Sequence, residues 1–298
     1  MEQEFASAPE GSGQDSAALC RDEIIKSLRK NRHYHAVLFS RFTKAVKDYR
    51  LVGPGDRIAV CVSGGKKSML MARLFLELKR HNKFPFELIF ISLDAGSTQE
   101  GRELTVSNAG LLGLPLQIFA PQTAQAGDHV EHTPCDPRPG EPVEQLFAKA
   151  EELGCNKIAL GQIFDDVIVK ILSEMIGRGR VQTLMPRLRS EKYTGMELIR
   201  PMYYVHEDDI DAWCRHVGLH FPPEGCPGGS PRTADGQEDI GRLQARQLIL
   251  KLRDDNPFLE QNIFRSVENI NLARIIGWRR DGQFINFLDG YNIPGQPQ

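Results

Sequence analysis

The stretch "DRIAVCVSGGKKSMLMARLFLELKR", Asp56 to Arg80, holds an apolar run that stops at a Ser-Gly-Gly turn, residues 63–65, and then resumes with a different spacing. Residues 58–62 are uniformly apolar, whereas a strand with one exposed face would alternate, so they predict a strand buried on both faces. After the turn, apolar residues recur at intervals of three and four, which predicts a helix over residues 67–80. The stretch therefore predicts a strand, a glycine turn and a helix in direct succession.

Further strands and helices alternate along the chain. The patterns predict strands at 86–93, 115–119 and 157–160, and helices at 143–153 and 165–176. Between the second and third strands, Thr98 can cap a helix that ends before Gly113. Strands separated by helices of this length predict an α/β fold, a doubly wound parallel sheet of Rossmann-like type with helices on both faces.

Composition divides the chain into four parts. Residues 1–20 are rich in small and acidic residues and predict a disordered tail, and residues 21–50 predict a helical segment. Residues 51–225 hold the α/β domain, including a Pro- and Gly-rich loop too long to be a mere connection. Residues 226–298 predict a loop and a helical C-terminal extension.

Charge, cysteine usage and hydropathy limit the class of protein. The net charge is −2 over 298 residues, so an anionic partner such as tRNA would need a local basic patch. The N-terminus lacks the features of a signal peptide, and no apolar run reaches the length of a membrane span. The cysteines form no C-x-x-C pair, which argues against a disulfide framework and predicts a cytoplasmic protein with no membrane partner. They are Cys20, Cys61, Cys135, Cys155, Cys214 and Cys226.

The glycine turn is a candidate phosphate site. Ligands of parallel sheets bind outside the carboxyl ends of the strands, where this turn would lie. Gly64 and Gly65 permit positive φ and a close backbone approach, and the following helix directs free N–H groups at the same spot. Ser63, Lys66 and Ser68 add hydroxyl donors and a cation. The alternative is a tight turn without a ligand, and the spacing alone leaves both interpretations open.

Several segments carry a family resemblance. "SGGKKS", residues 63–68, is similar to the SGGKDS signature of the PP-loop ATP pyrophosphatases. The chain also resembles the tRNA 2-thiocytidine synthetase family, in its clostridial-type branch, over about residues 34–289. The matching segments are "KIALGQIFDDVIVKIL" (157–172), "TLMPRL" (183–188), "GMELIRPMYYVHEDDI" (195–210) and "NPFLEQNIFRSVENINL" (256–272).

The resemblance implies a function and its cofactors. It implies a PP-loop fold that binds ATP with Mg²⁺, adenylates a tRNA cytidine and replaces the cytidine oxygen with sulfur. In the family, an iron–sulfur cluster is held by a C-x-x-C pair and one later cysteine. Asp165 and Asp166 would lie beside the phosphates as catalytic residues, and Gly161 would let the nucleotide approach the strand end. The implied ATP-binding loop consists of Ser63, Gly64, Gly65, Lys66, Lys67 and Ser68.

Lys67 departs from the family pattern, because the family has aspartate at this position. A second ammonium group would attract a triphosphate, whereas the loss of a carboxylate would leave a magnesium ion poorly placed. Gln162 and Ile163 replace a histidine pair of the family. The effect on turnover stays open at this point.

The cluster segment departs as well. Cys135 is kept, but Arg138 stands at the position of its C-x-x-C partner, and Cys226 matches the later ligand. Two thiolates alone would leave a cluster short of the number of ligands that such clusters use. The candidate metal site is therefore incomplete. The cysteines at 61, 155 and 214 are expected to be buried and to pack as small apolar residues.

Two basic segments are candidate tRNA contacts. The first consists of Arg178, Arg180, Arg187 and Arg189, and the second spans residues 26–33. The alternative is a solvated face balanced by acids such as Glu174. The acidic run at 207–211 predicts a helix N-terminus rather than a metal site. A sulfur donor protein and a homodimer follow only from the family resemblance.

Two function hypotheses remain. The first is a tRNA-modifying enzyme that uses ATP, with an altered sulfur supply or substrate. The second is a nucleotide-binding pseudoenzyme that keeps the fold without the cluster and the adenylation chemistry. The fold does not separate them, because function lies in the site.

Overall fold

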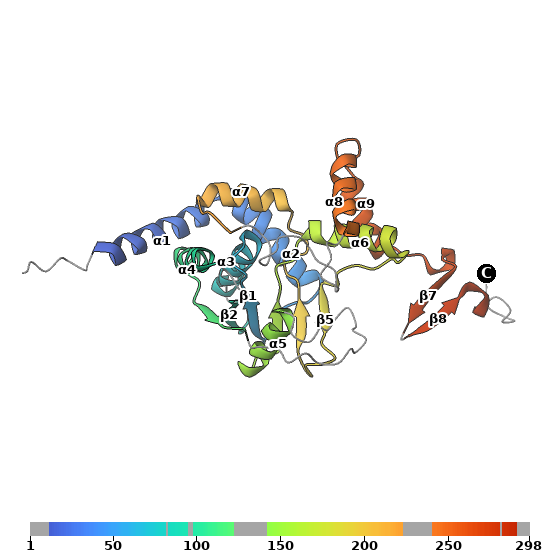
Figure 1. The fold of residues 1–298 in the computed structure, drawn as a ribbon, viewed down its shortest axis with the longest axis horizontal. Coiled ribbons are helices and arrows are strands. Elements are labelled where there is room, and N and C mark those ends of the chain that lie inside the picture. Colours follow the sequence, from blue (N-terminus) through green and yellow to red (C-terminus); the bar gives the residue numbers. More distant parts are fainter. Residues whose placement is uncertain are drawn as a thin grey trace, which may run out of the picture.

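The molecule is built around a six-stranded sheet with helices on both faces (Figure 1). A computed structural model describes residues 12–81, 83–94, 98–121, 142–222, 240–280 and 282–290. The strand order is β3-β2-β1-β4-β6-β5, and every pair is parallel except β5 with β6. The strands are β1 Arg57–Cys61, β2 Glu87–Leu93, β3 Leu116–Phe119, β4 Lys157–Ala159, β5 Arg187–Arg189 and β6 Glu197–Ile199. This arrangement confirms the doubly wound α/β fold.

Strand β1 lies inside the sheet, between β2 and β4. Ala59 pairs with Ile89 on one side and with Ile158 on the other. Successive side chains of β1 belong to two separate hydrophobic clusters: Ile58 and Val60 to one, Ala59 and Cys61 to the other. Because these side chains alternate between two buried faces, the apolar run needs no polar positions.

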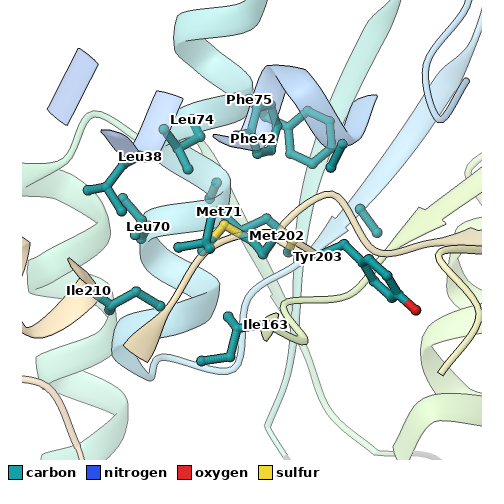
Figure 2. Packing of buried hydrophobic residues seen from close by; sticks show 14 of the residues in the cluster. Leu38, Phe42, Leu70, Met71, Leu74, Phe75, Ile163, Met202, Tyr203 and Ile210 are labelled. Carbon is teal, nitrogen blue, oxygen red and sulfur yellow. The ribbon is translucent and has the colours of Figure 1, made fainter. Parts of the chain in front are cut away.

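Helices cover the two faces unequally. Helix α5 lies on one face, where Phe147 stacks on Tyr193 at a centroid distance of 5.2 Å. The larger cluster on the other face takes in the N-terminal helices and α3, α6 and α7 (Figures 1 and 2). The connecting helices are α3 Lys66–His81, α4 Gln99–Leu111, α5 Pro142–Glu152, α6 Phe164–Arg178 and α7 Glu207–Val217. Thr98 caps α4 as the sequence predicts, since its hydroxyl accepts the Gly101 N–H at 3.2 Å.

The N-terminal segment forms α1 Ser12–Lys30, a π-helix Tyr34–Phe39 and α2 Ser40–Asp48. Helix α1 begins inside the stretch for which composition predicts a disordered tail, so the prediction places the start of the ordered chain too late. Ala and Leu at 17–19 are strong helix formers and extend the helix that the sequence predicts from residue 21. Residues 1–11 lie outside the described residues.

The C-terminal extension packs on the α/β domain. It consists of α8 Ile240–Leu252, α9 Leu259–Glu268, a 3-10 turn Leu272–Arg274, β7 Gly277–Arg280, β8 Gln283–Asn286 and a 3-10 turn Phe287–Gly290. Ala245, Ile249 and Phe264 are buried in the larger cluster, so α8 and α9 share the core of the domain. The β7-β8 hairpin, which the sequence analysis missed, extends away from the sheet (Figure 1). None of the described helices is both long and apolar enough to cross a membrane.

Substitution of Phe75 in α3 tests how much the larger hydrophobic cluster contributes to stability. Its ring is fully buried and meets Phe42 edge to face at a centroid distance of 5.2 Å (Figure 2). Phe75→Ala leaves a cavity, and we expect the free energy of unfolding to fall by about 3 to 5 kcal/mol in urea titrations. Phe284→Ala, at a ring that is 56% exposed on the hairpin, is the control. Equal losses in the two variants would contradict this account of the core.

Candidate nucleotide-binding site

The glycine turn and the Asp165 turn lie side by side. Strands β1 and β4 are parallel neighbours, and the chain reverses its winding direction between them, so the loops after both strands leave the same edge of the sheet. A Cβ atom added to Gly161 would lie 3.5 Å from the backbone N of Ser68. The structure thus brings together the loop at 63–68 and the start of α6, as the sequence predicts.

Gly64 has the backbone geometry that requires glycine. Its φ is +88°, while Gly65 is not among the described glycines with positive φ. A Cβ at Gly64 would lie 2.3 Å from Oγ1 of Thr105 on α4, which is far inside van der Waals contact. The loop is therefore pressed against α4 in a conformation that only glycine adopts without strain.

The two serines of the loop hold its shape. The Ser68 hydroxyl donates to the Gly65 carbonyl at 3.0 Å and accepts the Ser63 N–H at 3.1 Å. The two hydroxyl oxygens lie 3.1 Å apart. Ser68 is buried, so its hydroxyl organises the loop from below, whereas Ser63 is at the exposed rim.

Lys66 reaches across to helix α7. Its Nζ lies 2.7 Å from Oδ1 of Asp211 and 3.3 Å from Oε1 of Glu207. Burial opposes the charge of Lys66, but the hydrogen bond to Asp211 and the nearby Glu207 outweigh it, so the pKa of Lys66 lies above its ordinary value. The first loop lysine therefore stays charged and is held by two carboxylates.

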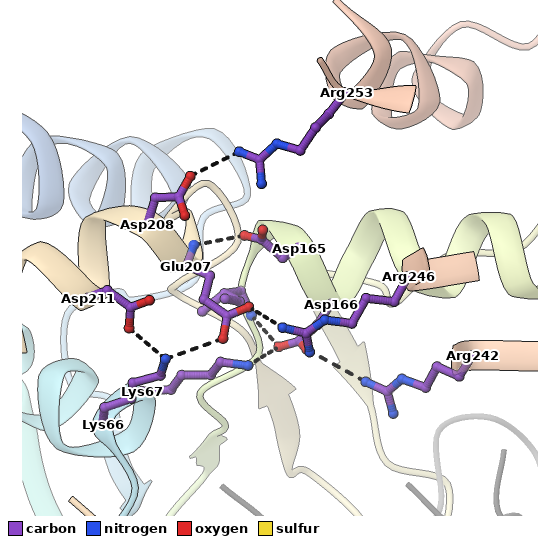
Figure 3. Close-up of polar contacts among 11 residues, drawn as sticks. Lys66, Lys67, Asp165, Asp166, Glu207, Asp208, Asp211, Arg242, Arg246 and Arg253 are labelled. Atoms are coloured by element: carbon purple, nitrogen blue, oxygen red, sulfur yellow. Dashed lines mark hydrogen bonds and ion pairs between the residues drawn. The ribbon is translucent and has the colours of Figure 1, made fainter. Parts of the chain in front are cut away.

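Lys67 points the other way, toward helix α6. Its Nζ lies 3.5 Å from Oδ2 of Asp166, and the same oxygen accepts the backbone N–H of Ile163 at 3.1 Å (Figure 3). The other oxygen of Asp166 lies 3.6 Å from the guanidinium group of Arg242 on α8. Both oxygens of Asp166 thus face a cation.

Asp165 has a different environment from its neighbour. Its carboxylate accepts the backbone N–H of Glu207 at 2.9 Å and so joins α6 to the start of α7. Burial raises the pKa of Asp165 to about 6, and the negative charges of Glu260 and Glu207 act in the same direction. A carboxyl group that titrates near neutral pH is typical of functional sites.

The acidic run at the start of α7 pairs with cations from three other elements. Asp208 bonds Arg253, in the turn after α8, at 3.0 Å, Asp209 pairs with Arg41 of α2, and Asp211 holds Lys66 of α3. Among the described residues, no group of three or more His, Cys, Asp or Glu side chains is arranged to hold a metal ion. The interpretation as a helix N-terminus agrees with this placement.

The sequence analysis missed some of the charged residues around the loop. Glu207, Asp211, Arg242 and Arg246 all lie here, although they follow the loop by more than a hundred residues. The only sequence signal for the two arginines is their spacing: residues four apart lie on the same face of a helix, so both can reach the same neighbour.

Positions 162 and 163, which replace a histidine pair of the family, serve the fold. Ile163 is fully buried, and Gln162 accepts a hydrogen bond from Nε of Arg200 at 3.2 Å. Neither side chain carries a titrating group to the site.

The candidate cluster ligands Cys135 and Cys226, with Arg138, lie outside the described residues. Cys61 and Cys155 are buried, and burial raises the pKa of both thiols, so they pack as small apolar groups. Cys214 is half-buried on α7.

The first basic segment is partly neutralised. Arg178 pairs with Glu174 at 3.1 Å, and Arg187 pairs with Glu197 at 2.7 Å. Arg180 and Arg189 are exposed, and Nε of Arg189 lies 3.6 Å from Glu197. The segment therefore offers some accessible cations beside others already held by acids.

Gly64→Ala should disrupt the loop. We expect the free energy of unfolding to fall by about 1 to 2 kcal/mol from the positive φ, with a further 1 to 3 kcal/mol, roughly, from the collision with Thr105. Gly55→Ala is the matched control, because Gly55 has φ +80° and open space at its Cβ. Urea midpoints of the two variants would show the difference, and equal effects would refute the close approach.

Asp165 should make the stability depend on pH. Its pKa of about 6 in the folded protein exceeds the ordinary 3.8, so the folded state retains a proton that the unfolded chain releases. The free energy of unfolding therefore falls as the pH rises from 3.8 to about 6 on account of this group. Asp165→Asn, which still accepts the Glu207 N–H, should match the native Tm near pH 4 and exceed it at pH 7.5, roughly. A variant less stable than the native chain at the higher pH would contradict this.

Comparisons with known proteins agree with this geometry. Residues 34–224 match the family model described as the PP-loop domain, which implies ATP binding. A tRNA-cytidine(32) 2-sulfurtransferase of Acaryochloris marina is 30% identical over 236 residues, covering 78% of this chain and 80% of the relative. One from Syntrophotalea carbinolica is 29% identical over 248 residues, covering 78% and 88%.

A solved structure shows the same fold. The U34-tRNA thiolase NcsA from Methanococcus maripaludis, solved with its [4Fe-4S] cluster, superposes with a TM-score of 0.54 at 19% identity, covering 84% of this chain and 81% of that one. The family matches span the glycine loop, the Asp165 turn and helix α7 together. The chain therefore belongs to the PP-loop domain family and, within it, to the family of the tRNA-cytidine 2-sulfurtransferases, as the sequence motifs predict.

Proposed function

We propose that this protein binds ATP on the loop at residues 63–68 and uses it to activate a tRNA cytidine for thiolation. The observation that carries the proposal is the geometry of Gly64, whose positive φ and close approach to Thr105 fix the glycine turn directly before helix α3. A helix N-terminus behind a glycine turn is a phosphate-binding arrangement. The relatives' activity on tRNA cytidine supports the choice of substrate.

The proposed chemistry uses the charged residues around the loop. The cytidine C2 oxygen attacks the α-phosphorus of ATP, and the bond from this phosphorus to the bridging oxygen breaks, so pyrophosphate leaves with the electron pair. The adenylated oxygen is then a good leaving group: a sulfur nucleophile at the oxidation level of sulfide attacks C2, the C2–S bond forms, and the C2–O bond breaks as AMP leaves with the electron pair. Lys66 and Lys67 would stabilise the charge that develops on pyrophosphate. Asp165 and Asp166 are the proposed catalytic carboxylates of this site.

Magnesium and a cluster fit this chain unequally. Asp165 and Asp166 offer the oxygen ligands that Mg²⁺ prefers, although both oxygens of Asp166 already face cations. A cluster does not fit, because Cys135 and Cys226 supply two thiolates and Arg138 replaces the third. We therefore propose that a separate donor protein supplies the sulfur.

The proposal also covers the domains, the tRNA contact, the location and the oligomeric state of the protein. Residues 51–225 are the proposed ATP-binding domain, and residues 226–298 extend it. The basic segment that includes Arg180 and Arg189 is the proposed tRNA contact, supported by the exposure of these two side chains. A cytoplasmic location and a homodimer are proposed on family resemblance.

One observation favours a second candidate, a nucleotide-binding protein without turnover. Lys67 places an ammonium group 3.5 Å from Asp166, where the family loop has a carboxylate. This cation compensates the charge of Asp166 without offering an oxygen ligand to a metal ion. The site would then bind the nucleotide but lack a metal ion placed for transfer.

ATP titration by calorimetry, with and without Mg²⁺, separates the candidates. We expect the native chain to bind ATP and Lys66→Ala to bind it about 10- to 100-fold more weakly, because a charge-assisted hydrogen bond is worth roughly 1.5 to 3 kcal/mol. Lys67→Asp should make binding more dependent on Mg²⁺. Lys192→Ala, far from the loop in the β5-β6 connection, is the control.

An assay of pyrophosphate release shows whether the protein turns ATP over. Release that requires both ATP and tRNA supports the enzyme, whereas ATP binding without release supports the second candidate. Binding that is absent in the native chain and regained in Lys67→Asp would overturn the proposal of a working site.

A further inference from the structure

Two carboxylates beside the loop are each shared between a loop lysine and an arginine of helix α8. Asp166 has Lys67 at 3.5 Å on one oxygen and Arg242 at 3.6 Å on the other. Glu207 has Lys66 at 3.3 Å on one oxygen and Arg246 at 2.8 Å on the other (Figure 3). The C-terminal helix therefore supplies a second row of cations, one carboxylate away from the loop lysines.

The arginines are not what holds α8 in place. Ala245 is fully buried and Ile249 nearly so, and this apolar stripe packs α8 onto α6. Arg242 and Arg246 lie four residues apart on the adjacent stripe, and their side chains are 38% and 56% exposed. The side chains of Asp166 and Glu207 are only 19% and 20% exposed, so the carboxylates form the inner layer and the guanidinium groups the outer one.

Nucleotide binding at the loop changes the balance of these charges. When Lys66 and Lys67 turn toward phosphate oxygens, they leave the two carboxylates that they now share. A half-buried carboxylate without a counter-charge is costly, particularly beside a polyphosphate. Each guanidinium group has five N–H donors, so it can hold a carboxylate with some and a phosphate oxygen with others.

We infer that Arg242 and Arg246 of helix α8 are binding residues for the polyphosphate of the nucleotide, completing a site that the loop alone leaves open. The inference rests on the proposed function, since it assigns new residues to the same site. It places part of the phosphate-binding site in the C-terminal extension, outside residues 34–224 that match the family domain. The ligand class is a nucleoside triphosphate or free pyrophosphate.

Calorimetry on the full chain tests the inference with ATP, adenosine and pyrophosphate as probes. We expect Arg242→Gln and Arg246→Gln each to weaken ATP binding about tenfold or more, and the double variant to weaken it further. Adenosine binding should change by less than about twofold, because adenosine carries no phosphate. Pyrophosphate binding should fall in parallel with ATP binding.

Arg253→Gln is the matched control. Arg253 directly follows the last residue of α8 and bonds an acid of α7, Asp208, at 3.0 Å, but it shares no carboxylate with a loop lysine. Its loss should leave ATP affinity unchanged. Unchanged ATP affinity in both test variants, or an equal loss of ATP and adenosine binding, would overturn the inference. If the native chain binds neither ATP nor pyrophosphate, both the proposed function and this inference are wrong. If the native chain binds ATP and the Arg242→Gln and Arg246→Gln variants bind it equally well, only the inference is wrong and the proposed function stands.

Discussion

The parallel pairing of β1 with β4 is the constraint on which the site depends. It places two chain reversals at one edge of the sheet, so that the backbone of the glycine loop lies against Gly161 and the start of α6. The second constraint is the close approach of Gly64 to Thr105, which fixes the loop from the side of α4. With the backbone held on both sides, the lysines that follow project in opposite directions, one toward α7 and one toward α6.

The charges around the loop form a nearly balanced set before any ligand binds. Lys66 is paired with two carboxylates and Lys67 with one, and one carboxylate partner of each lysine is also paired with an arginine. Because partly buried charges are tolerated when they are paired, the pairs around the loop stabilise one another. A polyphosphate must therefore compete with the acids for the lysines. At Lys67 the competitor is Asp166, and this competition would not arise in the family loop, which has a carboxylate at that position.

Much of the fold could be predicted from the sequence, and less of the site. The apolar run of β1 and the Thr98 cap have strong local signals, whereas β5 and β6 are only three residues long and show no periodicity. The loop and the Asp165 turn were recognised from motifs. The partners of Lys66, by contrast, are Glu207 and Asp211 of α7, and such pairings depend on tertiary packing rather than on local pattern. The early start of α1 has no clear local signal, because a segment rich in small and acidic residues is typical of a disordered tail.

The late position of α8 in the chain has a consequence for biosynthesis. The last strand of the sheet ends at Ile199, while α8 begins at Ile240. During translation the sheet and the glycine loop are complete before the arginines of α8 have been made, because domains form from the N-terminus as the chain emerges. The nascent protein thus carries an α/β domain whose α6 is still uncovered, and the charge set around the loop can close only after α8 has left the ribosome.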